Sequence, residues 1–89
     1  MLVHYIGLDR KIGESYKMNT ALVLAGGTGT RLGADIPKQY IEVNGRMIID
    51  YCLKTLNESD YIDAIRIVAE PVWQDKIRVP EKFIGFSRP

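Results

Sequence analysis

The chain has 89 residues, of which 46% are hydrophobic and 26% charged, and its formal net charge is +1. This composition is that of an ordinary globular protein of one domain at most, and it excludes the disordered and fibrous classes. Lysine and arginine form no stripe, so we expect neither a nucleic acid nor an anionic membrane as a partner. No apolar run approaches the roughly 20 residues that cross a bilayer, and no secretory leader is visible.

The single cysteine, Cys52, cannot form an internal disulfide. This agrees with a reducing compartment, so we expect a cytoplasmic protein. Cys52 lies among apolar residues at helical spacing, where a cysteine usually serves as a small core side chain.

Residues 1–17 show no sustained apolar period, whereas Met18 stands directly before the first clear strand. We therefore interpret residues 1–17 as an N-terminal extension, and we hypothesise that it is not native and that Met18 is the natural start. His4 has no second metal-binding side chain at a suitable spacing, so we take it as incidental.

Residues 20–25 form a continuous apolar run that ends at two glycines. Such a run predicts a parallel strand that is covered on both faces. The first strand of a doubly wound sheet is central, and one of its neighbours normally arrives from later sequence. We therefore expect an unpaired edge along residues 21–25, and with it association of the isolated chain.

A short extended piece is expected at residues 40–43, and the dipeptide Asn44-Gly45 is a strong turn signal. Apolar residues then recur at helical spacing. They predict an amphipathic helix over residues 47–57, with Asp50 on its polar side.

Residues 64–69 alternate apolar and polar side chains and predict a second strand. Pro71 is suited to the first turn of a short helix that reaches Ile77, and residues 82–86 predict a third strand. Strand, loop, helix, strand, helix, strand is the opening of a doubly wound sheet. The fold class we expect is α/β, as the N-terminal part of a Rossmann-like and mostly parallel sheet.

The glycine-rich loop over residues 26–33 suits a phosphate ligand. Glycine lets the backbone approach a ligand closely, and the amide groups of such a loop donate hydrogen bonds to phosphate oxygens. Arg31 adds one cation, and Lys38, just after Pro37, adds a second if the loop folds back. Two cations on a triphosphate stabilise the charge that builds as pyrophosphate leaves.

Other interpretations of the loop stay open at this point. The glycines can simply turn the chain while the two cations are solvated. A Walker A motif is excluded because no Gly-Lys-Ser/Thr sequence ends the loop. Gly27, Gly29 and Gly33 give a relaxed dinucleotide-binding pattern, although Glu70 lies too far on for the usual ~20-residue spacing of the acidic partner.

The whole string LVLAGGTGTRLGADIPKQY at residues 22–40 resembles the signature of the cytidylyltransferases that act on methylerythritol phosphate or ribitol phosphate. In that family a leucine-alanine-glycine loop leads to an arginine and then to Pro-Lys-Gln. The gap from Arg31 to Lys38 is shorter than in the hexose-phosphate nucleotidyltransferases. The resemblance covers nearly everything after Met18, so residues 18–89 would be an incomplete N-terminal part of a nucleotidyltransferase domain, of the nucleotide-diphospho-sugar transferase type.

The resemblance implies the roles of individual residues. The nucleotide-binding set would be Leu24, Ala25, Gly26, Gly27, Thr28, Gly29 and Thr30. Arg31 and Lys38 match the two basic residues that bind the triphosphate and stabilise the transition state at the α-phosphorus. The implied reaction is attack by a sugar-alcohol phosphate on the α-phosphate of CTP with release of pyrophosphate, and Mg²⁺ would bridge the phosphates. The methylerythritol branch would place the protein in isoprenoid biosynthesis.

The chain also departs from the family. The family's second glycine-rich segment, its magnesium-binding aspartate and its acceptor-binding basic residues all follow the point that matches Pro89. Asp35 is better explained as an exposed loop residue than as a substitute metal ligand. We therefore expect this chain to be inactive alone, and a homodimer only in the full-length enzyme. Gly26-Gly27 favours the ribitol branch weakly, so the acceptor stays undecided. The alternatives are a non-catalytic nucleotide-binding remnant and a fragment of a dinucleotide-dependent oxidoreductase.

Overall fold

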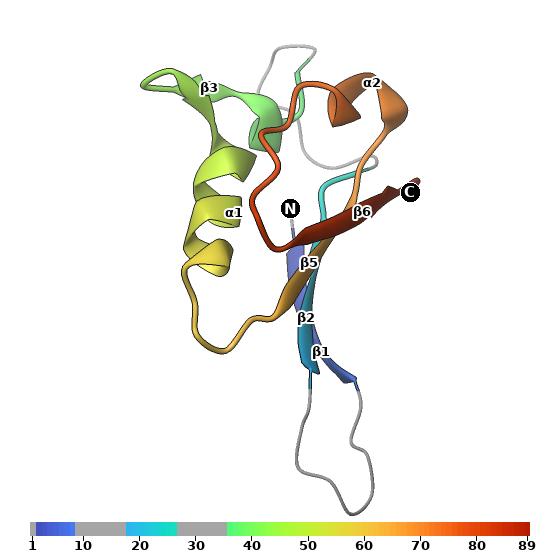
Figure 1. The fold of residues 1–89 in the computed structure, drawn as a ribbon. Helices are drawn as coiled ribbons and strands as arrows, with labels where there is room; N and C mark the ends of the chain where they lie inside the picture. The colour runs from blue at the N-terminus through green and yellow to red at the C-terminus, as the bar shows by residue number, and fades with distance from the viewer. Residues whose placement is uncertain (1, 9–17, 27–35) are drawn as a thin grey trace, which may run out of the picture.

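A computed structural model describes residues 2–8, 18–26 and 36–89. They contain a four-stranded sheet in the order β1-β2-β5-β6 (Figure 1). The strands are β1 (Leu2–Leu8), β2 (Met18–Leu24), β5 (Ala64–Val68) and β6 (Phe83–Ser87). β2, β5 and β6 run parallel to one another, and β1 is antiparallel to β2. The predicted α/β class with a parallel sheet is therefore confirmed.

The segment between β2 and β5 supplies the helix of this unit. A 3-10 turn η1 (Lys38–Tyr40) leads into a small hairpin of β3 (Glu42–Val43) and β4 (Arg46–Met47), and α1 (Ile48–Asn57) follows. A short helix α2 (Pro71–Gln74) connects β5 to the segment before β6. α1, β5 and β6 lie within one residue of their predicted bounds, whereas α2 ends three residues before the predicted Ile77.

The hairpin turn forms for the reason the sequence suggested. Asn44 and Gly45 both adopt positive φ, 54° and 84°. Two consecutive residues of positive φ match the right-handed twist of the strands on either side, and asparagine and glycine tolerate this conformation best.

β1 corrects the expectation of an unpaired edge on β2. Its register runs from Leu2 opposite Leu24 to Leu8 opposite Met18, so β2 lies between β1 and β5. The segment Leu-Val-His-Tyr-Ile contains good strand formers, but strand propensity depends strongly on the available partner. No apolar periodicity in this segment predicted a strand. Whether residues 1–17 are native stays a hypothesis.

α1 covers one face of the sheet (Figure 1). Ala21, Val23 and Ala25 are buried, whereas Leu22 and Leu24 are only half-buried. The prediction that β2 is covered on both faces is therefore wrong for the described part of the chain. The core cluster also contains Ile49, Leu53, Leu56, Ile65 and Ile67, and Cys52 packs against it as expected.

Asp50 corrects a second expectation, because it is buried rather than on the solvent side of the helix. Its carboxylate accepts hydrogen bonds from the backbone N–H of Met47, at 3.3 Å, and of Arg78, at 3.0 Å. An acidic residue at the third helical position commonly turns back to satisfy a free N–H at the helix start. Asp50 thereby ties α1 to the segment that precedes β6.

The structure also bears on membrane insertion. Over residues 2–8, 18–26 and 36–89, no helix has the length and apolar character needed to span a bilayer.

Candidate nucleotide site

Three parallel strands end together at one edge of the sheet. The N–H of Ala25, just beyond β2, donates to the carbonyl of Val68 at 2.8 Å. The N–H of Ala69, just beyond β5, donates to the carbonyl of Ser87 at 2.9 Å. Ligands of open α/β sheets bind outside these carboxyl ends of the strands. The predicted glycine-rich loop begins at this edge.

Ala25 is also held from the other side of the loop. Its carbonyl oxygen accepts a hydrogen bond from Nε2 of Gln39 at 2.8 Å and another from the hydroxyl of Tyr40 at 2.7 Å. Both side chains are buried, with 6% and 4% of their surface exposed. We call this arrangement the Ala25 clamp. It ties residues 39 and 40 to residue 25, and so joins the described segments on either side of the predicted phosphate loop.

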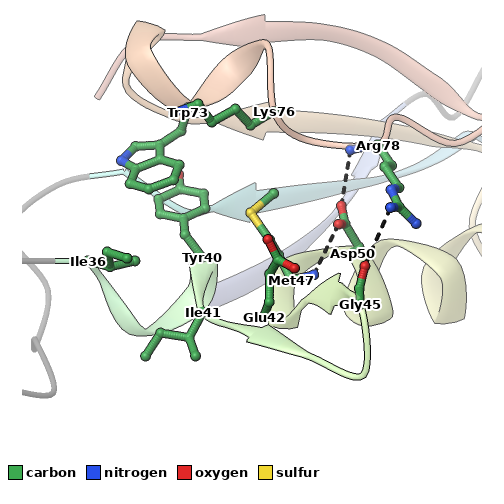
Figure 2. Close-up of a pocket in the computed structure, with 10 residues that line it drawn as sticks. All are labelled: Ile36, Tyr40, Ile41, Glu42, Gly45, Met47, Asp50, Trp73, Lys76 and Arg78. Atoms are coloured by element: carbon green, nitrogen blue, oxygen red, sulfur yellow. Dashed lines mark hydrogen bonds between the residues drawn. The ribbon is translucent and has the colours of Figure 1, made fainter. Parts of the chain in front are cut away.

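An aromatic stack supports the clamp. The rings of Tyr40 and Trp73, which belongs to α2, lie 4.3 Å apart between centroids and 8° from parallel (Figure 2). Nζ of Lys76 lies 5.0 Å from the centroid of a Trp73 ring, within the range of a cation–π contact. Burial, with a smaller contribution from the charge of Glu70, raises the pKa of Tyr40 to about 12. The hydroxyl therefore keeps its proton and donates at neutral pH.

The described part of the predicted site lies at this edge. Leu24 ends β2 half-buried, and Ala25 is fully enclosed. Gly26 follows, and the ring of Pro89 packs on it so closely that a side chain at position 26 would overlap that ring. Lys38 begins η1 and is exposed. Because it precedes the clamp residue Gln39 in the chain, its backbone is held near the same edge.

The rest of the predicted site lies outside the described residues. The predicted site residues concerned are Gly27, Thr28, Gly29, Thr30 and Arg31. The convergence of Arg31 and Lys38 on one triphosphate therefore stays a prediction.

A hollow of about 540 Å³ lies between the segment of residues 36–47 and the segment of residues 73–78 (Figure 2). Its lining consists of Ile36, Tyr40, Ile41, Glu42, Gly45, Met47, Asp50, Trp73, Lys76 and Arg78. Among the described residues, none that was predicted to bind nucleotide lines it. The Tyr40–Trp73 stack thus has one side toward this hollow, while the Tyr40 hydroxyl reaches the strand end.

A magnesium site was implied by the resemblance. No three His, Cys, Asp or Glu side chains come together within residues 2–8, 18–26 and 36–89. Carboxylate oxygens are the protein ligands that Mg²⁺ prefers. The described residues therefore do not fit a protein-held magnesium ion, and no step of the chemistry is derived through one.

Comparison with known proteins identifies the family. The model of the family IspD, 2-C-methyl-D-erythritol 4-phosphate cytidylyltransferase, matches residues 19–80. The chain belongs to this family. The matched region begins in β2 and ends just before β6, so it contains the strand end, the glycine-rich loop and the clamp, and it leaves β1 outside.

Individual relatives agree with this membership. A 2-C-methyl-D-erythritol 4-phosphate cytidylyltransferase of Thermotoga neapolitana is 50% identical over 60 residues, which are 67% of this chain and 27% of that protein. A ribitol-5-phosphate cytidylyltransferase of Lacticaseibacillus paracasei is 45% identical over 58 residues, or 65% of this chain and 25% of that protein. One from Vibrio parahaemolyticus is 42% identical over 62 residues, or 68% and 26%. The chain thus spans about a quarter of the length of these relatives.

Sequence reasoning missed the three residues of the clamp and its support. In the sequence, Gln39 drew notice only as part of the Pro-Lys-Gln motif. The available signal was the dipeptide Gln39-Tyr40 directly after the predicted basic residue, since two side-chain donors beside a functional residue often serve to position it.

Proposed function

We propose that this chain is the nucleotide-binding N-terminal part of a cytidylyltransferase. The enzyme would transfer CMP from CTP to a sugar-alcohol phosphate, either 2-C-methyl-D-erythritol 4-phosphate or D-ribitol 5-phosphate. An oxygen of the acceptor phosphate attacks the α-phosphorus of CTP and forms a new P–O bond. The bond from that phosphorus to the β-phosphate oxygen breaks, and pyrophosphate leaves with the bonding electrons.

The observation that carries the proposal is the Ala25 clamp. It ties the start of the glycine-rich loop to the residue after Lys38, at the carboxyl ends of three parallel strands. An ammonium group at that edge is suited to neutralise the charge that accumulates on a leaving pyrophosphate. Arg31 is proposed to act with it from within the loop. Family membership supports CTP as the nucleotide.

The family resemblance supplies further components of the proposal. Magnesium would be held by phosphate oxygens and by carboxylates from outside the described residues. The full-length enzyme would be a homodimer. The single cysteine supports a reducing compartment, and hence the cytoplasm, and the near-zero net charge supports the expectation that no nucleic acid or membrane surface is bound.

The nucleotide assignment is tested with Trp73, the one tryptophan of the chain. Because Trp73 stacks on Tyr40, movement of residues 38–40 on ligand binding should change its fluorescence. We expect CTP to change the emission at a lower concentration than ATP, GTP or NADP. A response to NADP at equal or lower concentration would support an oxidoreductase instead.

Lys38→Met sharpens the same experiment. Loss of one charge-assisted contact to a phosphate should weaken CTP binding about tenfold. Lys54→Met is the matched control, because it removes an exposed lysine on α1 that pairs with Glu58 across the helix surface. Equal CTP affinity of both variants would contradict the role proposed for Lys38.

The second candidate is a nucleotide-binding chain without catalytic activity. Such a chain would share the nucleotide site with the transferase and differ from it only in failing to transfer CMP to an acceptor. Pyrophosphate release would be measured with CTP, Mg²⁺ and each acceptor in turn. Release with one acceptor supports the transferase and identifies its substrate, whereas CTP binding without release with either supports the second candidate.

A further inference from the structure

The carbonyl group of Ala25 has no freedom to rotate. A carbonyl oxygen has two lone pairs, and here two buried side chains donate to it at 2.8 and 2.7 Å. The N–H of the same residue is fixed to Val68 at 2.8 Å. Both backbone polar groups of Ala25 are therefore held, the N–H by the neighbouring strand and the carbonyl by Gln39 and Tyr40.

Fixing this carbonyl also fixes the amide that follows. No peptide bond is cis in the described part of the chain. In a trans peptide unit the C=O and the N–H point in opposite directions within one plane. The N–H of Gly26 therefore points away from Gln39 and Tyr40. It is the first amide of the glycine-rich loop, and its direction is set by the clamp.

The clamp sets the place of Lys38 at the same time. The turn around it is closed by hydrogen bonds from the N–H of Tyr40 to the carbonyl of Pro37, at 3.0 Å, and from the N–H of Ile41 to that of Lys38, at 3.2 Å. Gln39 and Tyr40 are rigidly attached to Ala25 by their side chains. The backbone of Lys38 is thus held at a constant separation from the start of the loop.

The direction of the Tyr40 hydroxyl depends in turn on Trp73. The near-parallel stack at 4.3 Å confines the Tyr40 ring to one plane. The side chain of Gln74, next to Trp73, donates to the carbonyl of Ala69 at 2.9 Å, which ties α2 to the end of β5. Two adjacent strand ends are thereby joined through side chains as well as through the sheet.

We infer that Gln39 and Tyr40 are positioning residues that act jointly, by orienting the Gly26 amide and holding Lys38 so that both meet the phosphates of one nucleotide. This inference rests on the proposed function and assigns separate roles to Lys38 and to the two clamp residues. Lys38 contacts the phosphates, whereas the two clamp residues act only through the backbone.

The inference is tested with Gln39→Leu, Tyr40→Phe and the double variant in the 89-residue chain. Each single variant keeps one donor on the Ala25 carbonyl, so CTP affinity should fall only about threefold. The double variant leaves the carbonyl free to turn and should lose about thirtyfold, more than the roughly ninefold product of two independent losses. Affinity for cytidine, which has no phosphate, should change little in all three.

Tyr51→Phe is the matched control. Tyr51 also donates its hydroxyl to a backbone carbonyl, that of Val43, but on the exposed side of the α1 and hairpin region. The same loss of a phenol there should leave CTP affinity unchanged. A purely structural role of the clamp would lower affinity for CTP and cytidine in parallel, and that result would overturn the inference.

A second measurement needs no nucleotide. Loss of hydrogen bonds to a carbonyl oxygen moves the ¹³C resonance of that carbonyl upfield, so the Ala25 signal should shift in each variant and furthest in the double one. If the shift occurs and the folded double variant binds CTP like the unaltered chain, the positioning role of Gln39 and Tyr40 is wrong and the proposed function stands. If the unaltered chain does not bind CTP, the proposed function itself fails, whatever the Ala25 resonance shows.

Discussion

Two buried acceptors in this chain each hold a pair of donors, and each thereby ties its own residue to a later segment of the chain. The carboxylate of Asp50 accepts from the backbone N–H groups of Met47 and Arg78. The carbonyl of Ala25 accepts from the side chains of Gln39 and Tyr40. In the first contact the side chain is the acceptor and the backbone the donor, and in the second these roles are reversed.

The difference shows which of the two can serve a ligand. Asp50 accepts from one N–H at the start of α1 and from one in the segment before β6, so both of its contacts serve the fold. The Ala25 clamp lies at the carboxyl ends of parallel strands, where the loop that we propose to bind phosphate begins. Hydrogen-bond geometry alone does not separate a structural contact from a positioning one. The place of the contact relative to the strand ends separates them.

The largest effect is expected for Asp50→Ala. It leaves the buried N–H of Met47 and the part-buried N–H of Arg78 without an acceptor, each at a cost of about 1–3 kcal/mol, so the free energy of unfolding should fall by about 3 kcal/mol. Urea titration followed by circular dichroism measures this. The remaining folded protein should bind CTP as before, and a parallel loss of affinity would erase the distinction between the two contacts. Asp50→Asn keeps one acceptor oxygen, so its free energy of unfolding should lie between those of Asp50→Ala and the unaltered chain.

The second prediction concerns pH and Tyr40. Its pKa is raised from 10.0 to about 12 in the folded chain, chiefly by burial. Between these values the folded state keeps a proton that the unfolded chain has lost, so stability from this group is complete below about pH 10 and is lost as the pH rises through 12. Urea midpoints across this range should fall less steeply in Tyr40→Phe.

The ultraviolet absorbance of tyrosinate checks the same prediction directly. The part of the absorbance that is lost in Tyr40→Phe should appear only as the pH approaches 12. If that part appears near pH 10 while the chain remains folded, the Tyr40 hydroxyl is not enclosed as described.

A smaller effect is expected for Asp63→Ala. The Asp63 carboxylate accepts from the N–H of Asn19 at 2.8 Å, next to the starts of β2 and β5, but this contact is exposed to water. Water can replace the lost acceptor, so the free energy of unfolding should fall by only about 1 kcal/mol. A loss equal to that of Asp50→Ala would show that burial is not what sets the two apart.

The smallest effect is expected for Lys54→Ala. Lys54 and Glu58 lie 3.8 Å apart on α1 with both side chains largely exposed. Exposed pairs at this helical spacing contribute about 0.3–0.5 kcal/mol. The change should disappear at high salt, because exposed charges are screened. A loss above about 1 kcal/mol at high salt would contradict this.

The sequence predicted the parallel core of this fold because its signals are local. Apolar runs, the Asn44-Gly45 turn and the helical spacing around Leu53 each report their own segment, and the structure confirms all three. The family was predicted for a similar reason, since its signature is one continuous string. The match over residues 19–80 confirms it.

What the sequence did not predict depends on partners far along the chain. β1 is stabilised by the edge of β2, and its own residues carry no period that distinguishes them from a loop. Asp50 is buried because Arg78, 28 residues later, brings an N–H to it. The clamp has the same character, because the acceptor for Gln39 and Tyr40 is a backbone group that no side-chain pattern reveals.

The antiparallel course of β1 has a practical consequence for labelling. Leu2 pairs with Leu24, and Pro89 packs on Gly26, so both described ends of the chain meet at the edge where the glycine-rich loop begins. A purification tag or dye attached at either end would crowd that loop and report on it. Tyr61, which precedes β5 at the opposite edge of the sheet and is exposed, is the better place for a dye or for surface immobilisation.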